Sequence, residues 1–127
     1  MDLKELTKAE EQIMQILWDI KKGFVKDVLE KIPNPKPAYN TVSTIIRILE
    51  KKGFVGYASF GKTHEYYPLI TRDVYRSFFL KNVMGNYFGG SIRNLVSFFA
   101  KDNNLDIKDM EELMRHIEED LNNKEKK

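Results

Sequence analysis

Residues 38–53 read AYNTVSTIIRILEKKG and predict the helix on which the rest of the fold depends. Its apolar residues recur three, four and seven positions apart, the spacing of one buried helix face: Val42, Ile45, Ile46 and Leu49. The opposite face carries hydroxyls, an amide and cations in place of the usual mixture of Glu and Lys. Short polar side chains let a helix approach base edges, so this face is typical of a DNA-recognition helix. An ordinary surface helix is the alternative while the stretch is considered alone.

The flanking segments favour DNA recognition. A capping box, Thr7 with Glu10, begins a helix to about residue 21, with an expected buried stripe of Ala9, Ile13, Ile16, Leu17 and Ile20. A short amphipathic segment, 24–32, and a turn with three prolines in residues 33–37 come next. After Gly53 the apolar period changes to two, which predicts strands over 54–60 and 63–69 joined at Gly61-Lys62. A helix-turn-helix followed by a β-hairpin is the winged-helix arrangement.

The rest of the chain predicts three further helices, over 72 to about 88, from 92, and from 107, with a loop at 102–104. About fifty residues cannot bury so many aromatic side chains alone, so we expect a homodimer. The alternative packs these helices onto the winged helix of the same chain. The fold class is therefore mainly α with a small β-hairpin wing: a winged-helix domain, 1–70, and a helical dimerisation domain, 71–127. The expected dimer surface is Phe78, Phe79, Leu95, Phe98, Phe99, Leu113, Met114 and Ile117.

Charge is unevenly distributed along the 127 residues, although the net charge is only +2. Residues 31–62 contain six cationic side chains and one carboxylate, whereas residues 101–120 contain three cationic and eight acidic side chains. A basic middle and an acidic end indicate one surface for a polyanion and another that is kept away from it.

Several classes of protein are excluded. There is no Cys, which rules out disulfides and thiol-bound metals and fits a reducing compartment. No apolar run approaches the roughly 18 residues that span a bilayer, and the charged start is no secretion signal, so we expect a cytoplasmic protein without membrane insertion. The two histidines, His64 and His116, are far apart and have no spaced carboxylates, so we expect no metal site and no cofactor. No catalytic constellation is present, so we expect no enzyme.

The predicted partner is a double-stranded DNA operator. We expect base readout from one face of the recognition helix: Asn40, Thr41, Ser43, Thr44 and Arg47. We expect phosphate contacts from cations around that helix and at the hairpin tip: Lys36, Lys51, Lys52 and Lys62, together with His64. The second hypothesis is a winged helix that binds another protein and no DNA. Such a module would tolerate acidic residues around the helix, where this chain has cations.

Motifs along nearly the whole chain form one ordered pattern: Leu6-Thr7-Lys8-Ala9-Glu10, Leu17-Trp18, Tyr39-Asn40-Thr41-Val42, Leu49-Glu50-Lys51-Lys52-Gly53-Phe54-Val55, Tyr66-Tyr67-Pro68-Leu69 and Leu95-Val96-Ser97-Phe98-Phe99. The pattern resembles the bacterial penicillinase and methicillin-resistance repressors of the BlaI/MecI type. The resemblance implies a winged-helix domain, a helical dimerisation domain and repression through an inverted-repeat operator.

The resemblance also bears on how repression is relieved. In some members a membrane sensor-protease cuts the repressor between an Asn and a Phe. The Phe matches Phe99, whereas Phe98 stands in place of the Asn, so 98–99 is a candidate cleavage site that departs from the family pattern. Members commonly read bases with residues matching Thr41, Ser43 and Thr44; Ser43 replaces an Arg found in many of them, which implies a different operator. A copper-sensing branch uses cysteines, which this chain lacks.

Overall fold

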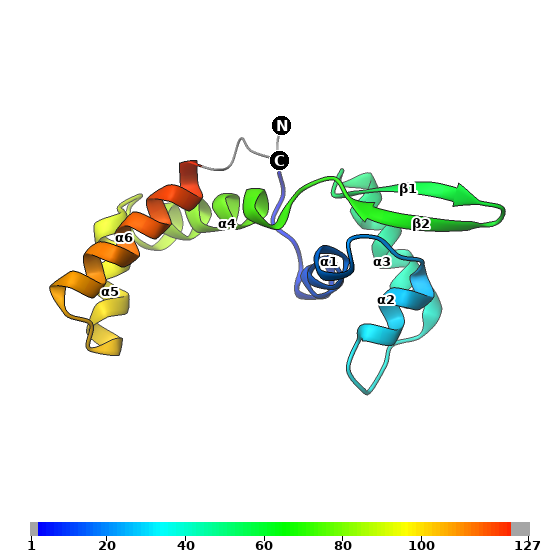
Figure 1. Cartoon of the computed structure of the whole chain (residues 1–127), viewed down its shortest axis with the longest axis horizontal. Coiled ribbons are helices and arrows are strands. Elements are labelled where there is room, and N and C mark those ends of the chain that lie inside the picture. Colours follow the sequence, from blue (N-terminus) through cyan, green and yellow to red (C-terminus); the bar gives the residue numbers. More distant parts are fainter. Residues whose placement is uncertain (1–2, 123–127) are drawn as a thin grey trace. The chain divides into compact units, whose positions relative to one another are not determined.

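The computed structural model describes residues 3–122, which form two compact units divided between Arg72 and Asp73 (Figure 1). The first unit contains α1 (Lys8–Ile20), α2 (Val25–Lys31), α3 (Tyr39–Lys51), β1 (Val55–Phe60) and β2 (Thr63–Pro68). The second contains α4 (Arg72–Tyr87), α5 (Ile92–Asn103) and α6 (Ile107–Asn122). Helices joined to one antiparallel hairpin confirm the mainly α class with a small wing.

The predicted capping box begins α1. The Thr7 hydroxyl accepts from the Glu10 N–H at 3.2 Å, and the Glu10 carboxylate accepts from the Thr7 N–H at 2.8 Å. The buried residues are Glu10, Ile13, Met14 and Leu17. Ala9 was expected in this stripe and is exposed, so that prediction is wrong. The buried face begins one residue later because the Glu10 side chain turns inward at the start of the helix.

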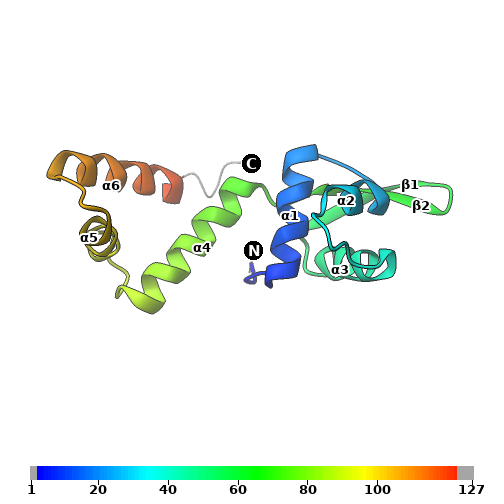
Figure 2. The same cartoon turned by 90° about the horizontal axis from the view of Figure 1, so that it is seen from below.

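Helix α3 buries the apolar stripe that the sequence predicted. Val42, Ile46 and Leu49 are fully buried, and Ile45 is half-buried at the edge of the stripe. Gly53 follows the helix with φ of +83°, a conformation that favours glycine, and the next N–H, of Phe54, donates to the Leu49 carbonyl at 2.9 Å. Helix α3 packs against α1 and α2, as Figure 2 shows, so its polar face remains outside the core.

The hairpin is tied to the helices as well as to itself. Its register pairs Tyr57 with Tyr66 and Ser59 with His64, and the tip turns at Gly61 with φ of +64°. Gly23, between α1 and α2, exchanges two backbone hydrogen bonds with Tyr66: its N–H donates at 2.9 Å, and its carbonyl accepts at 2.8 Å. This bridge fixes the middle of β2 against the turn that precedes α2.

The chain that leaves the hairpin is held on α1. The indole N–H of Trp18 donates to the Ile70 carbonyl at 2.8 Å. The Arg72 guanidinium lies 5.5 Å from the centre of the Trp18 ring and donates to the Asp19 carboxylate at 2.8 Å. These contacts keep residues 71 and 72 with the first unit.

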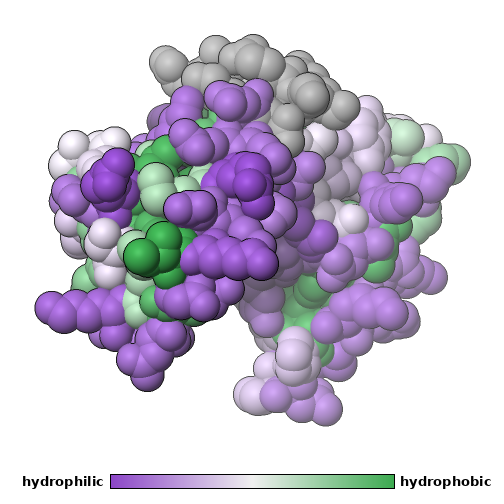
Figure 3. Space-filling view, turned by 60° about the vertical axis from the view of Figure 1, so that its left-hand side comes forward, coloured by the Kyte–Doolittle hydropathy of each residue, from purple (hydrophilic) through white to green (hydrophobic). Residues whose placement is uncertain are grey.

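The second unit buries little of its apolar surface. Helix α5 packs against α6, and α4 meets α6 where Arg76 donates to the Asp120 carboxylate at 3.1 Å and the Ser77 hydroxyl donates to the Asp120 carbonyl. No residue of α6 is buried, although its apolar stripe is intact: Met110, Leu113, Met114, Ile117 and Leu121. Figure 3 shows hydrophobic residues emerging between hydrophilic ones on the face that it draws.

Helix α5 is longer than the sequence predicted. The expected loop at 102–104 is wrong at Asp102 and Asn103, which are helical. The Asn103 side chain donates to the Phe99 carbonyl at 2.9 Å, which stabilises the last turn. The helix ends at Asn104, a left-handed residue with φ of +53°. Asn tolerates this conformation, so the polar residues that suggested a loop instead form a C-cap.

A largely buried ion pair joins the start of α1 to the end of α3. The Lys52 ammonium lies 2.8 Å from the Glu10 carboxylate, whose side chain is 5% exposed. Burial opposes ionisation of Glu10, but the hydrogen bonds and charge of Lys52 and the Thr7 N–H outweigh it, so the pKa of Glu10 is lowered from its usual 4.5.

We predict that Glu10→Gln lowers the free energy of unfolding at pH 7 by about 1–3 kcal/mol, because Lys52 loses its charged partner. The folded-state pKa of Glu10 is lowered, so its stabilisation is present above the usual pKa and is lost as the pH falls through the folded-state value. Urea unfolding from pH 7 to pH 3 measures this. The gap between wild type and variant should close at acidic pH, and a gap that stays constant contradicts the prediction.

Candidate nucleic-acid interface

The polar face of α3 is free of internal partners. Asn40, Thr41, Thr44 and Arg47 are exposed, and Ser43 is half-buried. Within residues 3–122 none of these five side chains takes part in a hydrogen bond or ion pair. The structure therefore brings the five predicted base-reading residues together on one accessible face.

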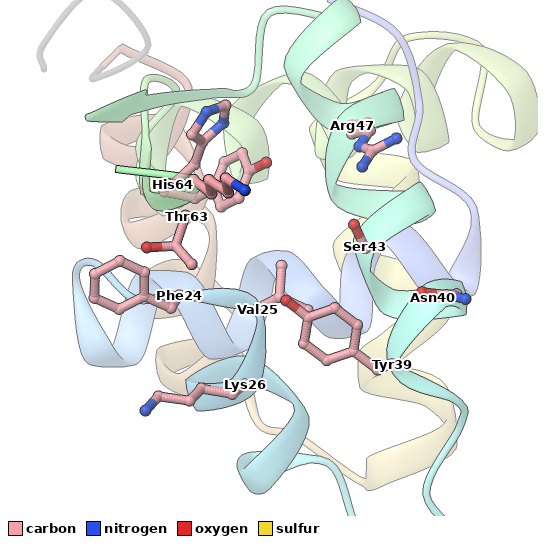
Figure 4. Close-up of a pocket in the computed structure, with 11 residues that line it drawn as sticks. Phe24, Val25, Lys26, Tyr39, Asn40, Ser43, Arg47, Thr63 and His64 are labelled. Carbon is pink, nitrogen blue, oxygen red and sulfur yellow. The ribbon is translucent and has the colours of Figure 1, made fainter. Parts of the chain in front are cut away.

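A groove of about 550 Å³ separates α3 from the hairpin (Figure 4). We call it the α3–wing groove. Asn40, Ser43 and Arg47 form its α3 side and His64 its hairpin side, whereas Thr41 and Thr44 lie outside it. The remaining lining residues are Phe24, Val25, Lys26, Tyr39, Lys62, Thr63 and Tyr66. The lining includes cations from three elements and no carboxylate.

The hairpin side of this groove is aromatic. The rings of Tyr57 and His64 stack in parallel, with centroids 4.1 Å apart and planes at 8°. Burial, and then the negative charge of Glu50, raises the pKa of Tyr66, so its hydroxyl remains neutral. Phe60 meets Phe24 edge to face at 5.8 Å, which supports the hairpin near its tip.

Two of the lysines predicted to contact phosphates have internal partners. The Lys36 ammonium donates to the carbonyls of Leu29 at 3.0 Å and Glu30 at 2.9 Å, so it neutralises the C-terminal end of α2. Lys52 is paired with Glu10. Lys51 and Lys62 are exposed, and Lys62 lies in the groove with His64. The structure thus brings Lys62 and His64 together and engages Lys36 and Lys52 elsewhere.

Sequence reasoning missed several residues of the groove, among them Tyr39 and Lys26. Tyr39, 51% exposed, begins α3 and lines the groove. It was detectable as a large aromatic residue outside the apolar stripe. Lys26 lies on α2, and nothing in its local sequence distinguishes it from an ordinary surface lysine. Only the packing of α2 beside α3 brings it to the groove.

The second unit presents an apolar surface made from the predicted dimerisation residues. Phe79, Phe98 and Phe99 are exposed, at 38%, 60% and 47%. The others are half-buried: Phe78, Leu95, Leu113, Met114 and Ile117. The ring of Phe98 lies 5.7 Å from that of Phe88, so this exposed side chain has one aromatic neighbour in its own chain. Exposed apolar surface of this kind is typical of an interface.

The match to a known family spans both units. A model of the penicillinase repressor family matches residues 6–119, from the residue before the α1 cap into the last turns of α6. The chain belongs to the penicillinase repressor family. The resemblance that the sequence motifs predicted is therefore confirmed. As a member of a family of transcriptional repressors, the protein is not an enzyme.

Individual relatives within the penicillinase repressor family match over most of their length. The methicillin resistance regulatory protein MecI of Staphylococcus aureus strain N315 is 29% identical over 110 residues, which cover 86% of this chain and 89% of MecI. The penicillinase repressor of Staphylococcus aureus is 29% identical over 121 residues, 94% of this chain and 95% of the relative. That of Bacillus licheniformis is 21% identical over 96% of each chain.

A solved structure matches the winged-helix part. The solution structure of the DNA-binding domain of the repressor BlaI superposes with a TM-score of 0.50 at 21% identity, over 56% of this chain and 88% of that one. This likeness confirms the winged-helix fold in this member of the penicillinase repressor family. Among residues 3–122, no helix has the length and apolar character needed to cross a membrane.

Proposed function

We propose that this member of the penicillinase repressor family represses transcription as a homodimer bound to an inverted-repeat DNA operator. The observation that carries the proposal is the polar face of α3, whose five side chains make no hydrogen bond or ion pair within the described residues. Three of them, Asn40, Ser43 and Arg47, border a groove that is lined by cations and no carboxylate. In this proposal the first unit is the DNA-binding domain, and α3 enters the major groove.

The proposed dimer is supported by the second unit. Helix α6 buries no residue within its own chain, and three phenylalanines of α4 and α5 remain exposed. A twofold dimer covers such a surface with the same surface of a second copy. It also delivers two recognition helices to the two half-sites of an inverted repeat. The second unit is therefore the proposed dimerisation domain.

Relief of repression by proteolysis is part of the proposal. Phe98 and Phe99 are exposed on α5, and a cut between them would separate α6 and the end of α5 from the rest of the chain. The partner would be a membrane sensor-protease of the type that the family resemblance implies. The bond lies inside a helix, so this turn of α5 must unwind before a protease can bind it in extended form.

We predict that Thr44→Ala weakens binding to the operator by about 1–3 kcal/mol, roughly five- to 150-fold. Thr44 is exposed on α3 outside the groove, so its hydroxyl and methyl group can meet a base edge. Titrations should compare a duplex from the promoter of the chain's own operon with a random-sequence duplex. Equal losses on both duplexes would make Thr44 a backbone contact and contradict base readout.

We predict that Lys62→Ala weakens binding to both duplexes and lowers the slope of log affinity against log salt by about one. Lys62 is exposed at the hairpin tip and lines the groove. Lys31→Ala is the matched control, because Lys31 is exposed on α2 and lies outside the groove lining. A slope unchanged from that of the control would remove Lys62 from the phosphate contacts.

We predict that Phe98→Asp converts the dimer to a folded monomer and weakens operator binding about a hundredfold or more, since tethering two modules raises affinity by about 10²- to 10⁴-fold. Phe98 is 60% exposed in the single chain, so the change costs the monomer little and places a charge in the proposed interface. Sedimentation and circular dichroism measure the result. Tyr87→Asp, at a 78% exposed position outside the predicted set, is the control. A dimeric Phe98→Asp variant would refute this interface.

A further inference from the structure

The α3–wing groove contains more ligand-binding chemistry than the recognition helix supplies alone. Lys26 of α2, Arg47 of α3 and Lys62 of the hairpin line it together with His64. Four hydroxyl groups line it as well, those of Tyr39, Ser43, Thr63 and Tyr66. The cations and hydroxyls fit a ligand with repeated negatively charged oxygens, and no carboxylate is among the lining residues.

We propose that this groove holds one sugar-phosphate strand of the DNA duplex, with Lys26 and Tyr39 as phosphate contacts. The proposal rests on the function proposed above. It also assigns Ser43 and Arg47, which the sequence grouped with the base-reading residues, to the same strand. Base readout then belongs to Thr41 and Thr44, which lie on α3 outside the groove.

The geometry of the duplex supports this assignment. In B-DNA a single sugar-phosphate strand separates the major groove from the neighbouring minor groove. A winged helix that places α3 in the major groove and the hairpin against the adjacent minor groove must therefore accommodate that strand between them. The α3–wing groove is the space between those two elements.

The chemistry of the lining fits both parts of such a strand. Lys26, Arg47 and Lys62 supply charge to phosphates, and the Tyr39 hydroxyl can donate a hydrogen bond. The Thr63 hydroxyl donates to the Phe60 carbonyl at 2.9 Å and so shapes the hairpin tip. The rings of Phe24 and His64 supply apolar surface for deoxyribose, and Tyr57 stacks on His64 from outside the lining. In Figure 4, Tyr39 reaches from the start of α3 toward the α2 side, below Arg47 and Ser43.

The groove is also held at a fixed width. The Gly23–Tyr66 hydrogen bonds attach β2 to the turn before α2, and Phe24 contacts Phe60 near the hairpin tip. Both contacts hold the hairpin against the start of α2 through backbone or packed rings, and α2 in turn packs against α3. The backbone on both sides of the groove is therefore in position before DNA arrives, which lowers the ordering cost of binding.

The test compares Lys26→Ala and Tyr39→Phe with the controls Lys31→Ala and Tyr67→Phe in the chain that contains both units. Lys31 lies on the same helix as Lys26 but outside the groove. Tyr67 alternates with Tyr66 along β2 and packs over Gly56 instead of lining the groove. Affinities are measured from 50 to 300 mM salt on the promoter duplex and on a random-sequence duplex of equal length, with thermal unfolding to check that each variant folds.

We expect Lys26→Ala to weaken binding to both duplexes equally and to lower the slope of log affinity against log salt by about one. We expect Tyr39→Phe to lower the affinity for both duplexes about three- to tenfold and to leave the salt slope unchanged, because the variant loses a hydrogen bond and no charge. Arg47→Ala should also weaken binding to the promoter duplex and to the random-sequence duplex equally. The proposal is overturned if Lys26→Ala and Tyr39→Phe match their controls, or if either acts on the promoter duplex alone. Failure of the wild-type chain to bind either duplex would instead refute the proposed function.

Discussion

Two backbone hydrogen bonds between Gly23 and Tyr66 hold the first unit in its working arrangement. They bring the end of α1, the start of α2 and the middle of β2 to one point. The junction is tightly packed: a Cβ atom at position 23 would lie 2.8 Å from the end of the Ile20 side chain and 3.2 Å from the Asp27 Cβ, so both side chains would have to shift. Asp27 in turn accepts from the Phe24 N–H at 2.9 Å and caps α2. The position of the hairpin beside α3 thus depends on a tightly packed junction at Gly23.

Local pattern predicted most of the secondary structure. The stripe of α3, the capping box of α1 and the change of period after Gly53 depend on residues close in sequence, so one stretch contains all the information. The two wrong predictions arose where the local pattern did not contain the deciding information. Ala9 was placed in the core because periodicity treats Glu10 as a surface residue, whereas Lys52, 42 positions away, makes burial of Glu10 favourable. The Asp102 and Asn103 prediction failed because polar residues suit a helix C-terminus as well as a loop.

The candidate site was predictable in part for the same physical reason. The residues that share the outer face of α3 follow from helical spacing alone, and the structure places them together. Helical spacing does not show which lysines remain available for phosphate contacts. Lys36 is bonded to the carbonyls of α2, and Lys52 is paired with Glu10. The groove itself requires α2, α3 and the hairpin to meet, so the sequence around Lys26 does not predict it as part of the groove. Tyr39 stands out only as an aromatic residue outside the apolar stripe of α3. The second unit differs, since its excess of aromatic residues is visible in composition alone.

Two contacts attach the end of the first unit to α1: the Trp18 indole donates a hydrogen bond to the Ile70 carbonyl, and Arg72 stacks on the Trp18 ring. The hydrophobic core of the first unit is complete before the second unit begins, with Ile70 as its last buried apolar residue. Substitutions in the second unit can therefore accumulate without disturbing how the DNA-binding surface folds. For a lineage of repressors this means modular evolution: the two units can diverge separately, each under its own selection.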